Sequence, residues 1–349
     1  TSALPIITCT PYASIFLRAL PILTSTPNPA ISPLALIADD MRAVDRVIAQ
    51  RLTTSVPLIG QISHYIIAAG GKRLRPAFLL LVCGALGYEG AQRFNLAAVV
   101  ELIHTATLLH DDVVDESTMR RGRATANESF GNPASVLVGD FLHTRSFQMM
   151  VEAGSMRIME ILSEATNVIA EGEVQQLINM HDASLDEAGY LRVIRSKTAK
   201  LFEASAQLGA ILAGSPPAIE AACATYGQAL GTAFQIIDDV LDYDGDTAEM
   251  GKNIGDDLRE GKSTLPLIAA MQRGTPEQAA TVRHAIEQGS TESLEKIVAI
   301  VKETGALEVA RAAAHAEAQR AITALACIPS NMYSASLLQL AAQLLARRT

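Results

Sequence analysis

Tryptophan is absent from this sequence, and all aromatic residues together make up only 4% of its 349 residues. Charged residues are also scarce, at 19%, whereas hydrophobic residues reach 49%, which favours a large aliphatic core and is not typical of a disordered protein. The four cysteines are scattered, without a C-x-x-C pair or a histidine at zinc-like spacing. Three of them stand among apolar residues, so we expect core thiols in a reducing compartment.

The chain also lacks an excess of basic residues and long uncharged apolar runs. Its net charge of −9 is typical of a protein that does not bind nucleic acid nonspecifically. An anionic substrate must therefore be held by local clusters of Lys and Arg or by a metal ion. Apolar runs long enough to cross a bilayer, about 18 residues, are missing, so no membrane span is predicted.

Residues 1–33 differ in composition from the rest of the chain. They are rich in Thr, Ser and Pro, contain one basic residue, Arg18, and have no acidic residue. The repeated prolines disfavour a helix, and a secretory signal would need a basic start and a longer apolar core. A transit peptide is the alternative, although several arginines would then be expected. We expect a weakly structured N-terminal extension.

Residues 34–349 show helical periodicity almost throughout, with little strand-like alternation and no stretch typical of an interdomain linker. Some segments are apolar on more than one face, as in Phe78–Val82, which is typical of the interior of a large bundle or of a subunit interface. The sequence therefore predicts an all-α, large single-domain helical bundle. The expected helices span 34–52, 55–69, 74–87, 91–116, 133–152, 156–181, 186–196, 198–213, 217–242, 264–272, 276–287, 291–303, 305–325 and 333–347.

A motif of three aspartates occurs twice, each time at the end of a long apolar run. The copies are Asp111-Asp112-Val113-Val114-Asp115 and Asp238-Asp239-Val240-Leu241-Asp242. At about 3.6 residues per turn, the first and third aspartates of each motif share one helix face. Unpaired buried carboxylates are costly, and Mg²⁺ prefers oxygen ligands, completing its shell with water and phosphate oxygens. Two such motifs predict a magnesium-bridged diphosphate between two helices, whereas one motif alone could equally be a solvated helix end.

Basic residues cluster in three stretches that can hold phosphates. Gly70–Pro76 places Lys72 and Arg75 at the expected start of a helix, where backbone N–H groups also favour an anion. Met119–Arg123 follows the first aspartate motif, and its guanidinium groups can either bind phosphate oxygens or balance nearby carboxylates. Arg195–Lys200 interrupts two apolar runs and can reach the same cavity.

Other polar residues extend the two aspartate helices. His104 lies close to two helical turns before Asp111 and so shares its stripe, and Gln235 precedes Asp238 by nearly one turn. The stretch Tyr243–Lys262 is polar and rich in Gly and Asp, and long loops in compact domains are usually functional. We expect this stretch to close over the diphosphate as a lid, with an acidic surface loop as the alternative.

Six stretches together resemble the trans-isoprenyl diphosphate synthase family, and most closely its long-chain bacterial octaprenyl type. They are GGKRLRP, LLHDDVVDESTMRRGRATAN, VGDFLHTRSFQMM, the Lys197-Thr198 step, FQIIDDVLDY and GKNIGDDLREGKSTLP. The match runs from about residue 34 to the C-terminus, with the motifs in family order. The resemblance implies an isoprenoid synthase fold with its active-site cavity between the two aspartate-rich helices. It also implies a prenyltransferase that extends an allylic diphosphate, such as farnesyl diphosphate, with successive isopentenyl diphosphates.

The resemblance implies a role for each motif residue. Asp111, Asp115 and Asp238 are expected to bind two or three Mg²⁺ ions on the allylic diphosphate, supported by Asp112, Asp239 and Asp242. These six aspartates, with Lys197 and Arg120, are the expected catalytic set. The residues expected to contact the allylic diphosphate or its metals are Arg120, Lys197, Thr198, Gln235, Lys252 and Lys262. Those expected to hold isopentenyl diphosphate are Lys72, Arg75, His104 and Arg121.

The resemblance also implies how the product length is set. In the family, bulky aromatics four or five residues before the first aspartate stop the growing tail, and here the small residues Thr107 and Ala106 occupy these positions. We therefore expect a deep tunnel and a long product, of seven to ten units, with octaprenyl diphosphate for quinone side chains foremost. Its floor is expected on the 133–152 helix at Phe147, Met149 or Met150, although a Met and Phe stripe is more often plain core.

The same resemblance suggests a homodimer in the cytoplasm that hands its product to a membrane by transient association. Three alternatives remain at this point. A shorter-chain farnesyl or geranylgeranyl synthase is the nearest. A class I terpene cyclase usually mixes Asn, Ser or Thr with Glu at its second metal site, where this chain has DDVLD. A regulatory partner without catalytic activity normally loses one aspartate motif, and this chain keeps both.

Overall fold

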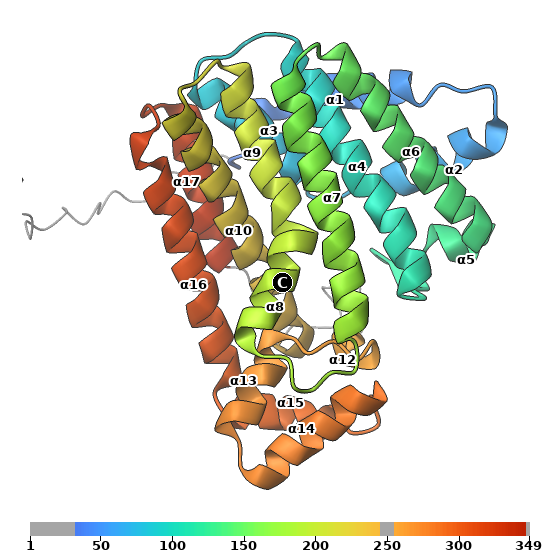
Figure 1. Ribbon diagram of the computed structural model, residues 1–349, viewed down its shortest axis with the longest axis vertical. Coiled ribbons are helices and arrows are strands. Elements are labelled where there is room, and N and C mark those ends of the chain that lie inside the picture. Colours follow the sequence, from blue (N-terminus) through green and yellow to red (C-terminus); the bar gives the residue numbers. More distant parts are fainter. Residues whose placement is uncertain (1–31, 245–254, 347–349) are drawn as a thin grey trace, which may run out of the picture. The chain divides into compact units, whose positions relative to one another are not determined.

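The computed structural model describes residues 32–244 and 255–346, and the chain from Pro33 onward forms one compact unit. Helices account for most of the described part, and its only strands are two short ones, so the all-α prediction is confirmed (Figure 1). The first half contains η1 (Ala35–Ile37), α1 (Ala38–Arg51), α2 (Pro57–Ala68), α3 (Leu74–Ala85), α4 (Gln92–Val114), β1 (Met119–Arg120), β2 (Arg123–Ala124), α5 (Ala126–Phe130), α6 (Asn132–Glu152) and α7 (Met156–Asn179). The second half contains α8 (Glu187–Ile194), η2 (Arg195–Ala199), α9 (Lys200–Leu212), α10 (Pro217–Asp244), α12 (Asp256–Arg259), α13 (Leu265–Arg273), α14 (Pro276–Gln288), α15 (Leu294–Glu303), α16 (Ala306–Ala324), η3 (Leu325–Cys327) and α17 (Met332–Leu345).

The core lies among long helices that pack side by side (Figure 1). Helix α10 packs against α9 and α16, α4 packs against α6, and α3 packs against both α4 and α9. Every residue of Pro76–Cys83 in α3 and of Leu96–Ile103 in α4 is buried, which explains why these helices are apolar all round. The aspartate motifs lie at the C-terminal ends of α4 and α10, so the bundle carries both on long, well-packed helices.

The predicted helix boundaries agree with the structure to within a few residues, but three features were missed. Strands β1 and β2 form a two-stranded antiparallel hairpin within the expected basic turn. Its two turn residues, Arg121 and Gly122, both have positive φ, as short hairpin turns of primed type require. The short helices α5 and α12 were not predicted either, and η2 is a π-helical turn that joins α8 directly to α9.

Several further predictions can be compared with the described ranges. Of the predicted extension 1–33, only the last two positions fall within them, and Lys252 of the predicted lid lies outside. Cys83 and Cys223 are buried, as expected of core thiols, whereas Cys327 is exposed. Among the helices of residues 32–244 and 255–346, none combines the length and apolar character needed to cross a bilayer.

Candidate active site

A cavity of about 530 Å³, here called the first cavity, lies between the ends of α4 and α10. Residues from α3, the β1 strand, α7, the η2 turn and the segment before α13 complete its walls. The structure therefore gathers predicted residues that are far apart in the sequence. Those that line the first cavity are Lys72, Arg75, His104, Thr107, Asp111, Asp115, Arg120, Arg121, Lys197, Thr198, Gln235, Asp238 and Lys262.

The first aspartate motif divides between cavity and interior as its spacing predicts. Asp111 and Asp115 line the cavity, and burial raises the pKa of Asp111. Asp115 accepts a 3.4 Å contact from the ammonium of Lys262. Asp112 is 1% exposed and does not line the cavity; it accepts two hydrogen bonds from Arg120, at 2.9 and 2.7 Å. Asp112 thus holds the Arg120 guanidinium beside the cavity.

In the second motif, only Asp238 lines the first cavity. Asp239 is buried and accepts hydrogen bonds from the Tyr190 hydroxyl at 2.6 Å and from the Gln235 amide at 2.8 Å. Burial raises the pKa of Asp239 to about 8. The carboxyl of Asp242 is buried too, and burial together with nearby Asp257 raises its pKa to about 8. Asp239 and Asp242 therefore lie buried at the end of α10 and do not line the first cavity.

On the opposite side, basic groups from α3 and its N-terminus line the cavity. A guanidinium nitrogen of Arg75 donates to His104 Nε2 at 3.0 Å, and the same group lies 4.4 Å from the Phe202 ring centroid. Burial lowers the pKa of Arg75 to about 10, which leaves it charged at neutral pH. Burial and the neighbouring arginines lower the pKa of His104 well below its usual value, so this imidazole is neutral. Lys72 lies 5.9 Å from the Phe234 ring centroid.

The Arg121 guanidinium packs closely against the backbone at Gly71, which explains why this position of the basic stretch is a glycine. A Cβ built on Gly71 would lie 2.7 Å from Arg121 Nη1, and Gly71 has a φ of +156°. The absence of a side chain thus lets Arg121 pack across the start of α3. Arg73, which we did not single out in the sequence, also lines the cavity and pairs with Glu101 at 3.3 Å.

Lys197 and Thr198 lie in the π-helical turn η2, between α8 and α9. Single π turns within α-helices are frequent at functional sites. The Thr198 hydroxyl donates to the Gln235 amide oxygen at 3.0 Å, and Gln235 in turn donates to Asp239. This chain of hydrogen bonds fixes the turn against the second aspartate motif.

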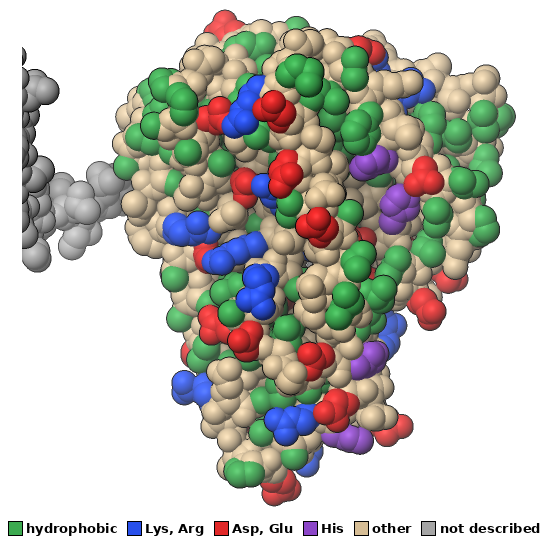
Figure 2. Space-filling model, viewed as in Figure 1, with side chains coloured by type: hydrophobic (Ala, Val, Ile, Leu, Met, Phe, Trp, Pro, Cys, Tyr) green, Lys and Arg blue, Asp and Glu red, His purple; other side chains and the backbone are tan. Residues whose placement is uncertain are grey.

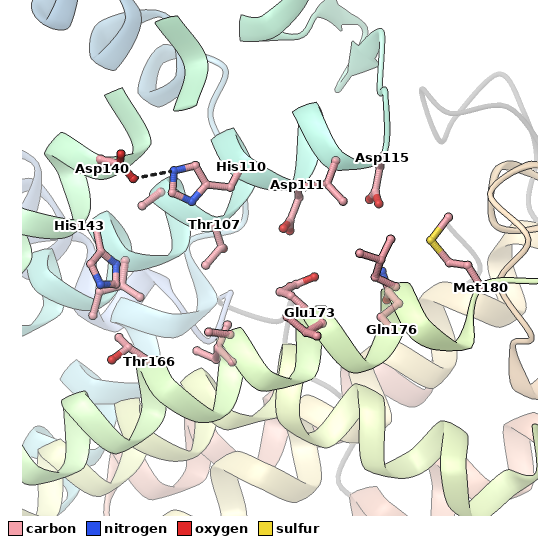
Figure 3. A pocket seen from close by; sticks show the side chains of 17 residues that line it. Thr107, His110, Asp111, Asp115, Asp140, His143, Thr166, Glu173, Gln176 and Met180 are labelled. Atoms are coloured by element: carbon pink, nitrogen blue, oxygen red, sulfur yellow. Dashed lines mark ion pairs between the residues drawn. The ribbon is translucent and has the colours of Figure 1, made fainter. Parts of the chain in front are cut away.

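Glu173 of α7 is a cavity residue that the sequence reasoning missed. Its carboxylate lies 2.6 Å from the Lys197 ammonium, and burial together with nearby Asp111 raises its pKa to about 7. Figure 3 shows it pointing from α7 toward Asp111 on α4. The one available signal was its neighbour Gly172, a glycine inside a strongly periodic helix.

A second cavity of about 440 Å³ adjoins the first (Figure 3). The two share Thr107, Asp111, Asp115 and Glu173, and the second continues between α4, α6 and α7 toward Ile103 and His143. Ala106 and Thr107, the two residues expected to leave the tunnel open, both line it. Within the described part of the chain, the predicted floor residues do not line either cavity: Met149 and Met150 are fully buried in the core, and Phe147 packs against the His143 ring.

The donor groups of the first cavity fit magnesium bound together with a diphosphate. In residues 32–244 and 255–346, no three His, Cys, Asp or Glu side chains are close enough to form a complete metal cage. Asp111, Asp115 and Asp238 are nevertheless all oxygen donors that face one cavity from two helices. Mg²⁺ takes one or two carboxylates and fills its remaining positions with water and phosphate oxygens. Open carboxylates opposite a group of cations are what such binding needs.

Comparison with known proteins agrees with this geometry. A family model described as Polyprenyl synthetase matches residues 56–303. The chain belongs to the polyprenyl synthetase family. Over 307 residues, 88% of this chain and 95% of its relative, it is 54% identical to the octaprenyl diphosphate synthase of Escherichia coli strain K12. The family resemblance inferred from the sequence motifs is therefore confirmed.

Solved structures of the same family share the fold. A polyprenyl synthase from Caulobacter crescentus, in complex with calcium and isoprenyl diphosphate, matches with a TM-score of 0.88 and 45% identity, covering 91% of this chain and 97% of that one. A decaprenyl diphosphate synthase from Rhodobacter capsulatus matches with a TM-score of 0.86 and 46% identity, covering 91% and 98%. The predicted isoprenoid synthase fold is thereby confirmed.

Proposed function

We propose that this protein is a long-chain trans-polyprenyl diphosphate synthase, a prenyltransferase that condenses an allylic diphosphate with successive isopentenyl diphosphates. The observation that carries the proposal is the first cavity, where Asp111, Asp115 and Asp238 from two helices face a group of cations from α3 and η2. Octaprenyl diphosphate is the proposed product, supported by the 54% identity to the octaprenyl enzyme of E. coli.

We propose that the two substrates bind to two different sets of residues in the first cavity. Asp111, Asp115 and Asp238 would hold two or three Mg²⁺ ions with the allylic diphosphate, and bound magnesium would neutralise charge on the departing diphosphate. The groups proposed to contact that diphosphate or its metals are Arg120, Lys197, Thr198, Gln235, Lys252 and Lys262. The groups proposed for isopentenyl diphosphate are Lys72, Arg75, His104 and Arg121.

The Lys and Arg side chains of this set would favour ionisation of the allylic carbon–oxygen bond, because their positive charges stabilise the negative charge that develops on the leaving diphosphate. The double bond of isopentenyl diphosphate then attacks the allylic cation, and a proton is lost to the released diphosphate. Neutral His104, hydrogen-bonded to Arg75, orients that guanidinium and takes no proton in this scheme. The apolar walls keep water away from the cation.

The growing tail would enter the second cavity at Thr107 and pass Ala106. The second cavity has a mainly apolar lining, and Ile103, Ile169 and Ala170 line it beyond Glu173. The small side chain of Ala106 leaves the entrance open, which supports a long product. The predicted floor at Phe147, Met149 or Met150 stays a prediction.

We also propose a homodimer, located in the cytoplasm, that releases its product by transient contact with a membrane for quinone synthesis. The dimer is supported by large hydrophobic side chains exposed on neighbouring helices. Leu137 on α6 and Leu177 and Ile178 on α7 are 66%, 55% and 68% exposed. Hydrophobic side chains are visible over this part of the surface in Figure 2. Exposed apolar surface of this kind is commonly covered in homo-oligomers, most often through closed two-fold symmetry.

Incubation of the purified protein with farnesyl diphosphate, labelled isopentenyl diphosphate and magnesium tests the function. The expected result is label in allylic products that are longer than the primer. Folded protein that consumes farnesyl diphosphate without incorporating label would indicate a cyclase, and folded protein inert toward both substrates would contradict the proposed enzyme.

A further inference from the structure

The ammonium of Lys197 has two carboxylates within reach, and its distances to them are unequal. Its Nζ lies 2.6 Å from Glu173 Oε2 and 4.0 Å from Asp111 Oδ2. The first distance is that of a charge-assisted hydrogen bond, and the second is at the outer limit of an ion pair. In the free protein, therefore, Glu173 and not Asp111 binds this cation.

The backbone keeps Glu173 close to Lys197. Its neighbour Gly172 packs directly against the π turn, since a Cβ built there would lie 2.8 Å from Lys197 N and 2.8 Å from Ser196 Cβ. Helix α7 can approach η2 this closely only because position 172 has no side chain. Helix packing thus places the Glu173 carboxyl within reach of the Lys197 ammonium.

Asp111 is proposed as a magnesium ligand, and an ammonium in direct contact with a ligand carboxylate competes with the metal for it. We propose that Glu173 is a positioning residue that holds the Lys197 ammonium away from Asp111 and so leaves the Asp111 carboxylate to magnesium. The same contact keeps the ammonium in the wall of the first cavity, where the departing diphosphate would meet it. This inference rests on the magnesium–diphosphate site of the proposed function.

A double-mutant cycle tests the inference through binding, without turnover. Calorimetric titration with inorganic pyrophosphate at increasing magnesium concentrations gives the magnesium concentration at half-maximal binding. In Glu173→Gln, the neutral amide binds the ammonium less strongly, Asp111 becomes its nearest charged partner, and the magnesium requirement should rise about tenfold, equivalent to about 1.4 kcal/mol. In a Lys197→Met background there is no ammonium to move, so Glu173→Gln should cause no further rise.

Glu171→Gln is the matched control. It removes the same charge from the same helix, but Glu171 is exposed and bonds to Asn167, so the magnesium requirement should not change. A general loss of negative charge would raise the requirement equally with and without Lys197. That result, or no rise in Glu173→Gln alone, would overturn the inference.

Label incorporation by the wild-type protein separates this inference from the proposed function. If the wild type incorporates label but the effects of Glu173→Gln and Lys197→Met on the magnesium requirement are additive, the inference is wrong and the proposed function stands. If the two substitutions have coupled effects on pyrophosphate binding but the wild type incorporates no label, the inference stands and the proposed function is wrong. A wild-type protein that binds no magnesium pyrophosphate contradicts both.

Discussion

Aspartates with the same spacing have different surroundings in the two motifs. Asp111, Asp115 and Asp238 line the first cavity, whereas Asp112 is bonded to Arg120 and Asp239 to Tyr190 and Gln235. The i, i+1, i+4 pattern alone predicted which aspartates of the first motif share a face. It did not predict the partners of Asp112 and Asp239. Arg120 reaches Asp112 because the β1–β2 hairpin folds back, and Tyr190 reaches Asp239 through packing between distant helices.

Asp238→Asn should lower the rate of condensation at least about 100-fold, because it removes a proposed metal ligand and with it charge stabilisation of the leaving group. Steady-state kinetics with saturating substrates measures the change. Asp244→Asn, six residues further along α10, is the control. It removes a surface pair with Arg311 and should change the rate less than about twofold. Similar losses in both variants would contradict the assignment.

His104 gives a pH dependence with a defined sign. Burial lowers its pKa well below 6.5 in the folded protein, so below pH 6.5 the unfolded chain binds a proton that the folded chain does not. Stability therefore falls as the pH drops, by about 1 kcal/mol from this group between pH 7 and 5.5. Urea unfolding of the ligand-free protein at both pH values should show a smaller drop for His104→Gln than for the wild type. An equal drop would rule out this origin.

At the level of elements, the long helices were predictable because their apolar periodicity is strong. The π turn η2 was not, because its conformation depends on neighbours that the local sequence does not contain. Gly172 of α7 and Gly231 of α10 both pack against it, and a Cβ on Gly231 would lie 2.9 Å from Ala199 Cα. Glu173 was missed for the same reason. In the sequence it is one acid among several on its helix, and only packing brings it to Lys197.

Gly231→Ala should destabilise the protein by at least about 1 kcal/mol, because the added methyl group forces α10 away from η2. Gly60→Ala is the matched control. Gly60 lies within α2 with no atom within 4 Å of a built Cβ, and alanine there should raise stability by about 0.5–1 kcal/mol. Thermal unfolding monitored by circular dichroism measures both changes. A stabilised Gly231→Ala variant would contradict the close packing around the π turn.

For the whole molecule, the amino-acid composition already favoured a large aliphatic bundle. The hydrophobic side chains that this bundle leaves exposed give a prediction about the oligomeric state. Ile178→Asp on α7 should convert the proposed homodimer into a monomer, because burying an unpaired carboxylate in an apolar interface is costly. Light scattering after size-exclusion chromatography gives the mass. Met332→Asp at the start of α17, another exposed hydrophobic position, should leave the mass unchanged. A wild-type protein that is itself monomeric would end the dimer proposal.

A long product requires the chain to grow from the aspartate motifs into the second cavity past Ala106. The most direct measurement compares product lengths of the wild type, Ala106→Phe and Ile297→Ala after dephosphorylation and chromatography. The wild type should give mainly products near forty carbons, and Ala106→Phe should give distinctly shorter ones, because the ring fills the entrance. Ile297→Ala should lose about 2–5 kcal/mol of stability and keep the product length, since Ile297 of α15 is buried outside both cavities. Unchanged product length in folded Ala106→Phe would contradict the account.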